Sequence, residues 1–170
     1  MRKTGLGIAR AAYDYRDYAY WYGAKGETAT LPLLNRLAKE NKGVYSSRYI
    51  EECKNDIRGN KRVCDCSGLV CHALGISDIG SYQIGQKFKE WKDEPKEGMI
   101  AWRQGHVAIF RKGGFVIEMQ GQSTDFRDDR YYKDAGFTKI LYDPSINYDC
   151  EELYIPRGWH LINGIEQEIK

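Results

Sequence analysis

A chain of 170 residues is long enough for one domain with a sizeable hydrophobic core. Hydrophobic residues make up 42% of it and charged residues 29%, which excludes an intrinsically disordered chain. The formal net charge of +2 is too balanced to indicate binding to nucleic acid or to a membrane surface. We therefore expect one globular domain over residues 1–170, with no nucleic-acid or membrane partner.

The first half of the chain has the apolar spacing of helices. Residues 5–22 and 27–41 each place their apolar side chains on one helical face. Ser46 is suited to cap a third helix that runs to about residue 57. A fourth helix is predicted from Cys66 to the glycine at position 75, and its apolar face indicates a buried, central helix.

After residue 94 the apolar period changes from helical to strand-like. Residues 81–91 still predict a polar helix, and residues 121–136 are expected to form a polar loop. The segment 112–114 should join two strands as a hairpin. Helices followed by an antiparallel sheet predict an α+β domain. The expected strands are 99–102, 107–110, 115–119, 137–142 and 157–162.

The five cysteines are an odd number, so they cannot all be paired in disulfides: Cys53, Cys64, Cys66, Cys71 and Cys150. The basic N-terminus is not followed by an apolar segment of signal-peptide length, and no stretch is long enough to cross a bilayer. We expect synthesis in a reducing cytoplasm, so action outside the cell would need release or export.

Cys66 is the candidate nucleophile because it lies where a strand or loop enters a helix. The backbone N–H groups and the dipole of a helix start stabilise negative charge, so we expect a lowered thiol pKa.

A thiolate also needs a base, and the chain has three histidines. His72 lies six residues along the same helix and faces away, and nothing local supports His160. His106, which follows a glycine at the start of a strand, is favoured as the base. An ion pair between Cys66 and His106 would keep alkylation fast well below pH 8.

The third residue of the site depends on the register of the hairpin. If Arg111 pairs with Phe115, Glu118 lies diagonal to His106 on the same face, and Gln120 lies opposite His106. A two-residue turn would move Glu118 to the other face. Glu118 is therefore expected to orient His106, with Gln120 as the alternative.

A zinc site is a second interpretation of the cysteine-rich segment. Cys64, Cys66, Cys71 and His72 are all residue types that bind zinc. Their spacing is not that of common zinc modules, which use two separated pairs of ligands. We therefore expect no metal and no cofactor, and the roles of Cys64 and Cys71 stay open.

Four segments together resemble the NlpC/P60 family of cysteine peptidases. Residues 65–70 (DCSGLV) resemble its nucleophile motif, and residues 105–110 (GHVAIF) resemble its histidine strand. Residues 20–23 (YWYG) resemble its aromatic segment, and residues 115–118 (FVIE) fall where the family has its third polar residue. The details are most similar to the phage and Gram-positive endolysin branch. Residues 121–170 carry no motif that this resemblance assigns.

The resemblance implies a papain-like fold with N-terminal helices packed on an antiparallel sheet. It also implies a peptidoglycan hydrolase that cleaves an amide in the peptide stem of the bacterial cell wall. Cys66 would attack, His106 would serve as base and then acid, and Glu118 would orient His106.

The same resemblance assigns substrate contacts. Tyr20, Asp65 and Ser67 match positions that the family uses for substrate contact or for the oxyanion, and Gln120 is the fourth candidate. The expected partner is the peptidoglycan stem peptide.

Several alternatives share parts of this pattern. A secreted antibacterial effector would use the same chemistry and would bind an immunity protein. A papain-like acyltransferase or protein-specific protease would differ in its substrate, and a non-catalytic binding module would have an unreactive Cys66. The sequence leaves the scissile bond, the stem type and the oligomeric state open.

Overall fold

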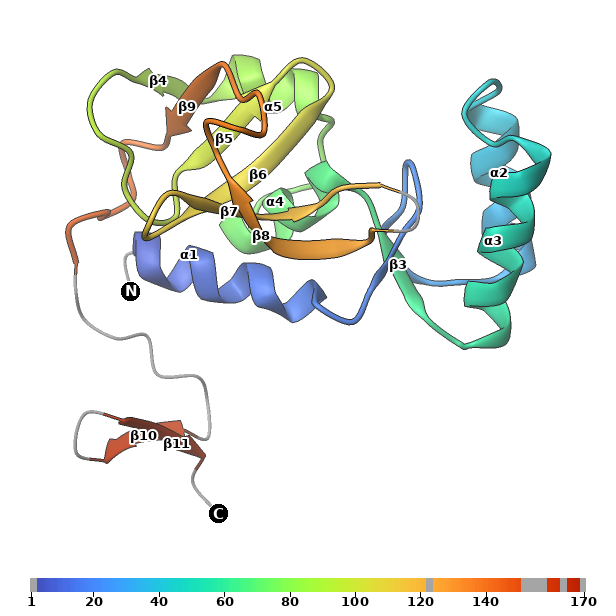
Figure 1. Ribbon diagram of the computed structural model, residues 1–170, viewed down its shortest axis with the longest axis horizontal. Coiled ribbons are helices and arrows are strands. Elements are labelled where there is room, and N and C mark those ends of the chain that lie inside the picture. The colour runs from blue at the N-terminus through green and yellow to red at the C-terminus, as the bar shows by residue number, and fades with distance from the viewer. Residues whose placement is uncertain (1–2, 122–123, 151–158, 163–164, 169–170) are drawn as a thin grey trace.

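The computed structural model describes residues 3–121, 124–150, 159–162 and 165–168. Its centre is a six-stranded antiparallel sheet in the order β4-β9-β5-β6-β7-β8 (Figure 1). The strands of this sheet are β4 (Lys89–Trp91), β5 (Ile100–Arg103), β6 (His106–Arg111), β7 (Phe115–Met119), β8 (Phe126–Tyr131) and β9 (Lys139–Tyr142).

The five α-helices in the described residues all precede this sheet in the chain. They are α1 (Gly5–Ala12), α2 (Leu31–Glu40), α3 (Ser47–Arg58), α4 (Cys66–Leu74) and α5 (Ser81–Lys87). A short 3₁₀ helix (Tyr13–Tyr15) extends α1. None of the helices in the described part of the chain is long and apolar enough to cross a membrane.

A small sheet leads the chain into α4. Its central strand is β3 (Arg62–Cys64), which pairs in parallel with β1 (Ala19–Tyr20) and antiparallel with β2 (Lys25–Thr28). Because β3 ends at Cys64, β1 and β2 both lie beside the turn that precedes Cys66. This small sheet therefore determines where the first turn of α4 begins.

The main core lies between α1, α4 and one face of the six-stranded sheet (Figure 1). Leu69 and Val70 of α4 are fully buried there against Ile109 and Ile117 of the sheet. Alternate strand residues point to the opposite face, where Ala108 belongs to a second apolar cluster. The central strands are thus buried on both faces, which fixes their register.

The α2–α3 pair has its own small core and lies to one side of the large sheet (Figure 1). Leu34 and Leu37 of α2 pack there with Trp21, which is fully buried. The Trp21 Nε1–H donates a 2.9 Å hydrogen bond to Asp56 Oδ2 of α3. This anchor connects the helical pair to the segment that leads from β1 to β2.

Two of the expected N-terminal helices were predicted too long. The first ends at Ala12 and the 3₁₀ turn, because Ala19 and Tyr20 pair with β3 instead. The second begins only at Leu31, where the Thr30 side chain caps it, and the preceding residues form β2. In both places pairing with the distant β3 overrides the local helical pattern.

Two further predictions in the second half were wrong. The helix expected over 81–91 ends at Lys87, and Lys89–Trp91 forms β4 against β9. The polar loop expected over 121–136 contains β8, which pairs with β7. β8 is an edge strand, so its polar side chains do not reveal it by alternation.

Other predictions are confirmed. Ser46 caps α3, and α4 runs from Cys66 to a left-handed Gly75 cap. The hairpin has the register in which Arg111 pairs with Phe115. The strand expected at 137–142 contains β9.

Of the stretch 157–162, Trp159–Ile162 forms β10 against β11 (Ile165–Glu168), and residues 157–158 lie outside the described residues. The single domain over 1–170 stays a prediction.

Candidate functional site

Cys66 is the first residue of α4, and the residue before it caps that helix. The Asp65 side chain accepts a 2.7 Å hydrogen bond from the Gly68 N–H, as an N-cap does. Cys66 itself is only 8% exposed. Backbone groups of Val107 and Ser67 hydrogen-bond to its thiol. The thiol therefore lies between the start of α4 and the start of β6.

The expectation of a lowered thiol pKa at Cys66 was wrong for this structure. Burial and the adjacent Asp65 carboxylate raise the Cys66 pKa to about 11. The hydrogen bonds from the backbone and the nearby Lys25 ammonium act in the opposite direction but do not compensate. Desolvation of the thiolate thus exceeds the effect of the helix start. Near neutral pH the resting residue is a thiol.

His106 and Glu118 form a buried pair on neighbouring strands. His106 Nε2 lies 2.7 Å from Glu118 Oε1, and the exposed fractions of the two residues are 4% and 0%. The confirmed hairpin register places Glu118 diagonally across from His106. Of the two candidates for this partnership, the structure brings Glu118 rather than Gln120 to the imidazole.

Arg130 of β8 completes the environment of this pair. Its guanidinium donates two hydrogen bonds to the Glu118 carboxylate, at 2.9 Å from Nε and 2.6 Å from Nη2. Burial opposes ionisation of Glu118, but the hydrogen bonds from His106 and Arg130 outweigh it and lower the Glu118 pKa. Glu118 is therefore held as a carboxylate between two donors.

The backbone of β6 connects the Cys66 thiol to the strand that carries His106. The β6–β7 pairing covers Ile109 to Arg111 and stops before Val107. Beyond that point the backbone of Val107, next to His106 in the chain, faces the Cys66 thiol. Among the described residues no hydrogen bond joins Cys66 directly to His106.

Three residues near this site were missed by the sequence analysis: Lys25, Arg130 and Phe137. The Phe137 ring stacks on His106 with a centroid separation of 5.6 Å and an interplanar angle of 21°. Neither Arg130 nor Phe137 has a local sequence pattern that links it to the site, and Arg130 lies in the stretch that was predicted as a loop. Only the fold brings them to the histidine.

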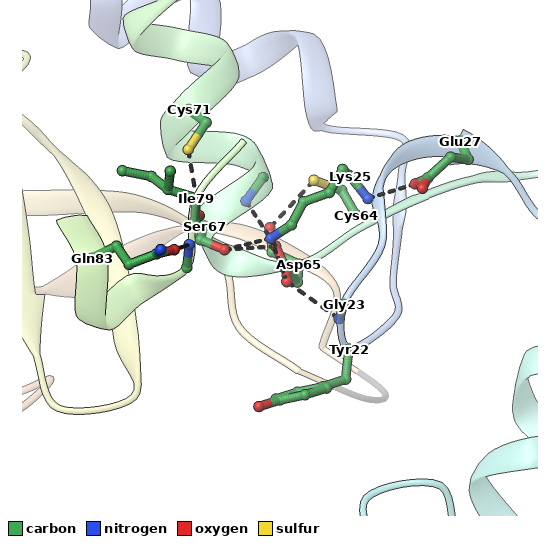
Figure 2. A network of polar contacts seen from close by, with 12 residues as sticks. Tyr22, Gly23, Lys25, Glu27, Cys64, Asp65, Ser67, Cys71, Ile79 and Gln83 are labelled. Carbon is green, nitrogen blue, oxygen red and sulfur yellow. Dashed lines mark hydrogen bonds and ion pairs between the residues drawn. The ribbon is translucent and has the colours of Figure 1, made fainter. Parts of the chain in front are cut away.

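The predicted substrate contacts Asp65 and Ser67 lie in a polar network with Lys25 (Figure 2). Lys25 Nζ lies 2.8 Å from both carboxylate oxygens of Asp65 and 2.6 Å from Ser67 Oγ. Asp65 also accepts hydrogen bonds from Ser67 Oγ at 3.1 Å and from the Gly23 N–H at 3.2 Å. These polar atoms are thus engaged within the protein. Their contact with substrate stays a prediction.

Tyr20 lies close to the thiol, and Gln120 directly follows β7. Burial, followed by the nearby Cys66 and Asp65, raises the Tyr20 pKa. The hydroxyl of Tyr20 is therefore a protonated donor at any physiological pH. The Gln120 carbonyl accepts a 2.9 Å hydrogen bond from Arg127. The substrate-binding roles of Tyr20 and Gln120 also stay predictions.

The other histidines and cysteines lie apart from this arrangement. His72 Nε2 pairs with Asp14 at 2.8 Å on the surface, as expected for a residue that faces away from Cys66. The side chain of His160 lies outside the described part of the structure. The Cys64 thiol donates to the Asp65 carbonyl at 3.3 Å, and the Cys71 thiol to the Ile79 carbonyl at 3.6 Å.

All five cysteines are free thiols. Within the described residues no group of three or more potential metal ligands converges on one point.

Comparison with known proteins gives a likeness of fold. No family model and no curated protein sequence matches the chain. The structure of NlpC1 from Trichomonas vaginalis matches with a TM-score of 0.52 at 11% identity over 85% of this chain. The structure of NlpC2 from the same organism matches with a TM-score of 0.52 at 12% identity, also over 85%.

This chain spans 44% and 46% of the two solved proteins, which is less than half of either. The chain therefore has the papain-like α+β fold of the NlpC proteins, as the sequence predicted.

Proposed function

We propose that this protein is a cysteine hydrolase that cleaves an amide bond in the peptide stem of bacterial peptidoglycan. The observation that carries the proposal is the buried 2.7 Å contact between His106 and Glu118, together with the position of Cys66 as first residue of α4 against the backbone of Val107, the residue after His106. The NlpC-like fold and the four resembling segments support the substrate class.

The raised pKa of Cys66 requires a base in the first step. His106 directs Nε2 to the Glu118 carboxylate, so Nδ1 is the nitrogen that accepts the thiol proton. The thiolate sulfur then attacks the amide carbonyl, and the imidazolium returns the proton to the leaving amine. A water molecule, deprotonated by His106, hydrolyses the thioester and releases Cys66.

Glu118 and Arg130 make this proton transfer possible. An ionised Glu118 fixes the orientation of the His106 ring and stabilises the imidazolium that forms during attack. Arg130 holds the carboxylate in place from the other side with two hydrogen bonds. Both are positioned by strands, which are more rigid supports than loops.

The start of α4 supplies the groups that stabilise the oxyanion. The first backbone N–H groups of a helix have no partners within it, and the Cys66 N–H is one of them. The protonated Tyr20 hydroxyl, close to Cys66, is the second donor in this proposal. The Gly68 N–H does not contribute, because it is bonded to Asp65.

The biological setting is part of the same proposal. The resemblance to endolysins favours a protein that reaches the cell wall after release or export, with the stem peptide as its partner and no role for nucleic acid or membrane. Wall cleavage by an antibacterial effector would use the same residues.

The test is digestion of purified peptidoglycan by the full chain, followed by mass spectrometry of the soluble fragments. The wild type should release fragments with new amino and carboxyl termini in the stem, and Cys66→Ala should release none above background. Equal release by Cys66→Ala would refute the proposal. Thioester formation on Cys66 without wall cleavage would instead indicate an acyltransferase or a protein-specific protease.

A further inference from the structure

We propose that Lys25 is a positioning residue of the Cys66 centre: it fixes the turn that presents the thiol, and it neutralises the carboxylate that caps α4. This inference rests on the proposed function of Cys66. It concerns a residue that the sequence pattern does not single out. Its evidence is the network around Asp65 (Figure 2).

The side chain of Lys25 connects β2 to the first turn of α4. In the small sheet, Lys25 lies opposite Cys64, the last residue of β3. From there its ammonium group reaches both oxygens of Asp65 at 2.8 Å and Ser67 Oγ at 2.6 Å. These two residues stand on either side of Cys66. Lys25 therefore binds the chain immediately before and immediately after the nucleophile.

The Lys25 ammonium is largely removed from water, which strengthens its electrostatic effect. Its side chain is 23% exposed and that of Asp65 is 11% exposed. Burial lowers the Lys25 pKa, but Asp65, Cys64 and Cys66 outweigh burial and raise it. Lys25 is thus a permanent cation in a region where charges are only partly screened.

Asp65 has two opposing effects on the site. Its carboxylate caps α4 through Gly68 and so determines where Cys66 lies. The same negative charge raises the Cys66 pKa and opposes formation of the thiolate. Lys25 offsets this second effect, because its cation pairs with Asp65 and lowers the Cys66 pKa. The titratable groups near the thiol are Asp65 and Cys64 on its own segment, Lys25 on β2 and Tyr20 on β1, and β6 faces the thiol with the backbone of Val107.

The two members of the pair can be distinguished by the direction in which their loss moves the thiol titration. Lys25→Met leaves the Asp65 charge uncompensated, so the titration midpoint of Cys66 should rise. Asp65→Asn removes the opposing charge and still offers an oxygen to cap α4, so the midpoint should fall. A purely structural role of the network would give the same direction for both variants.

The experiment is the pH dependence of iodoacetamide alkylation at Cys66 in the full chain, followed by peptide mass spectrometry. At a fixed pH below the midpoint, we expect Lys25→Met to lower the rate about tenfold and Asp65→Asn to raise it about tenfold, since one pKa unit changes the thiolate fraction tenfold. Lys25→Arg should stay closer to the wild type than Lys25→Met does. Lys39→Met, which removes the same charge from the exposed side of α2, should change nothing.

Alkylation needs no substrate, so this result is independent of whether the protein cleaves peptidoglycan. An unchanged rate in Lys25→Met, or a shift of Asp65→Asn in the same direction as Lys25→Met, would overturn the inference. If circular dichroism shows that Lys25→Met does not fold, the alkylation rates of Asp65→Asn and Lys25→Arg test the inference instead. A midpoint in Asp65→Asn at or above that of the wild type would then refute the electrostatic role.

Discussion

At the scale of single residues, the state of the Cys66 thiol determines how the site has to work. A cysteine at a helix start is usually a good candidate for a stable thiolate, but here burial and Asp65 raise its pKa to about 11. A preformed ion pair with His106 is not the resting state in this structure. The proposed mechanism is instead like that of a serine hydrolase, in which a base removes the proton of the nucleophile during attack.

This difference predicts slow alkylation of Cys66 at neutral pH. The rate should rise continuously with pH towards a midpoint near 11, and at pH 7 it should be roughly 300-fold below that of an ordinary thiol of pKa about 8.5. The same cysteine alkylated in urea provides the control, since unfolding removes the burial. A plateau of the native rate between pH 6 and 8 would show a preformed ion pair and would contradict this account.

Arg130 should influence activity through Glu118 rather than by contact with substrate. Arg130→Gln removes two hydrogen bonds that help to lower the Glu118 pKa, so Glu118 would take up a proton at higher pH. The acid limb of the pH–rate profile should therefore move to higher pH by up to about one unit. Arg127→Gln, on the same strand, is the matched control. A uniform loss of rate at every pH would argue for a structural effect only.

At the scale of elements, the junction of β3 with α4 is packed too closely to accept an added methyl group at position 68. A Cβ on Gly68 would collide with the Cys64 sulfur, and Ala24 and Asp65 also lie within 3.2 Å of its ideal position. This contact gives buried Cys64 a structural reason to be there. It also fixes the distance between β3 and the helix that begins at Cys66.

Gly68→Ala should therefore lower the free energy of unfolding by about 1–3 kcal/mol, the usual range for overpacking. Adding Cys64→Ala should recover part of that loss, because it removes the sulfur. Gly59→Ala, where a Cβ would meet only ordinary contact distances, is the control. Urea unfolding of the four proteins measures these differences. No recovery in the double variant would place the clash elsewhere.

Local patterns predicted some elements well and failed on others for a physical reason. The hairpin register followed from Arg111 and Phe115 on either side of a glycine-rich turn, and α3 followed from its Ser46 cap. The strands β1 and β2 exist because they pair with β3 far away in the sequence, and local composition does not record such pairing. The strand β8 pairs with neighbouring β7, but as a polar edge strand it has no apolar alternation to reveal it.

The candidate site divides in the same way. Cys66, His106 and Glu118 were found because each lies in a recognisable local setting, and the predicted contact between the last two is present. Lys25 lies 40 residues before its partner Asp65 in the chain, and Arg130 lies 12 residues after its partner Glu118. Neither residue has a local sequence pattern that indicates its role. The prediction of a lowered Cys66 pKa was wrong because the effect of burial, which the sequence does not reveal, exceeds the effect of the helix start.

At the scale of the whole molecule, Glu118 connects the site to stability in acid. Its pKa in the folded protein is lowered below the ordinary value of 4.5, so the unfolded chain binds a proton first as the pH falls. The stabilisation from Glu118 is therefore complete above about pH 5. It is lost progressively as the pH falls through the folded-state pKa.

Glu118→Gln should show a smaller loss of stability between pH 7 and pH 3.5 than the wild type, although it is less stable at pH 7. The reason is that an amide does not titrate, while it also loses the charged bonds to His106 and Arg130. Urea midpoints at the two pH values give the comparison. Glu90→Gln on the exposed strand β4 is the control, and it should behave as the wild type does. An equal acid loss in wild type and Glu118→Gln would mean that Glu118 is not held ionised.

The central claim is that Cys66, His106 and Glu118 act as one catalytic unit on peptidoglycan, and residues that act as a unit have non-additive effects. The most direct test is the rate of stem-peptide cleavage, measured as new termini by mass spectrometry, for Cys66→Ala, Glu118→Gln and the double variant. We predict that Glu118→Gln alone lowers the rate roughly 10²- to 10⁴-fold, and that the double variant is no slower than Cys66→Ala. Measurable cleavage by Cys66→Ala, with a further multiplicative loss in the double variant, would contradict the account.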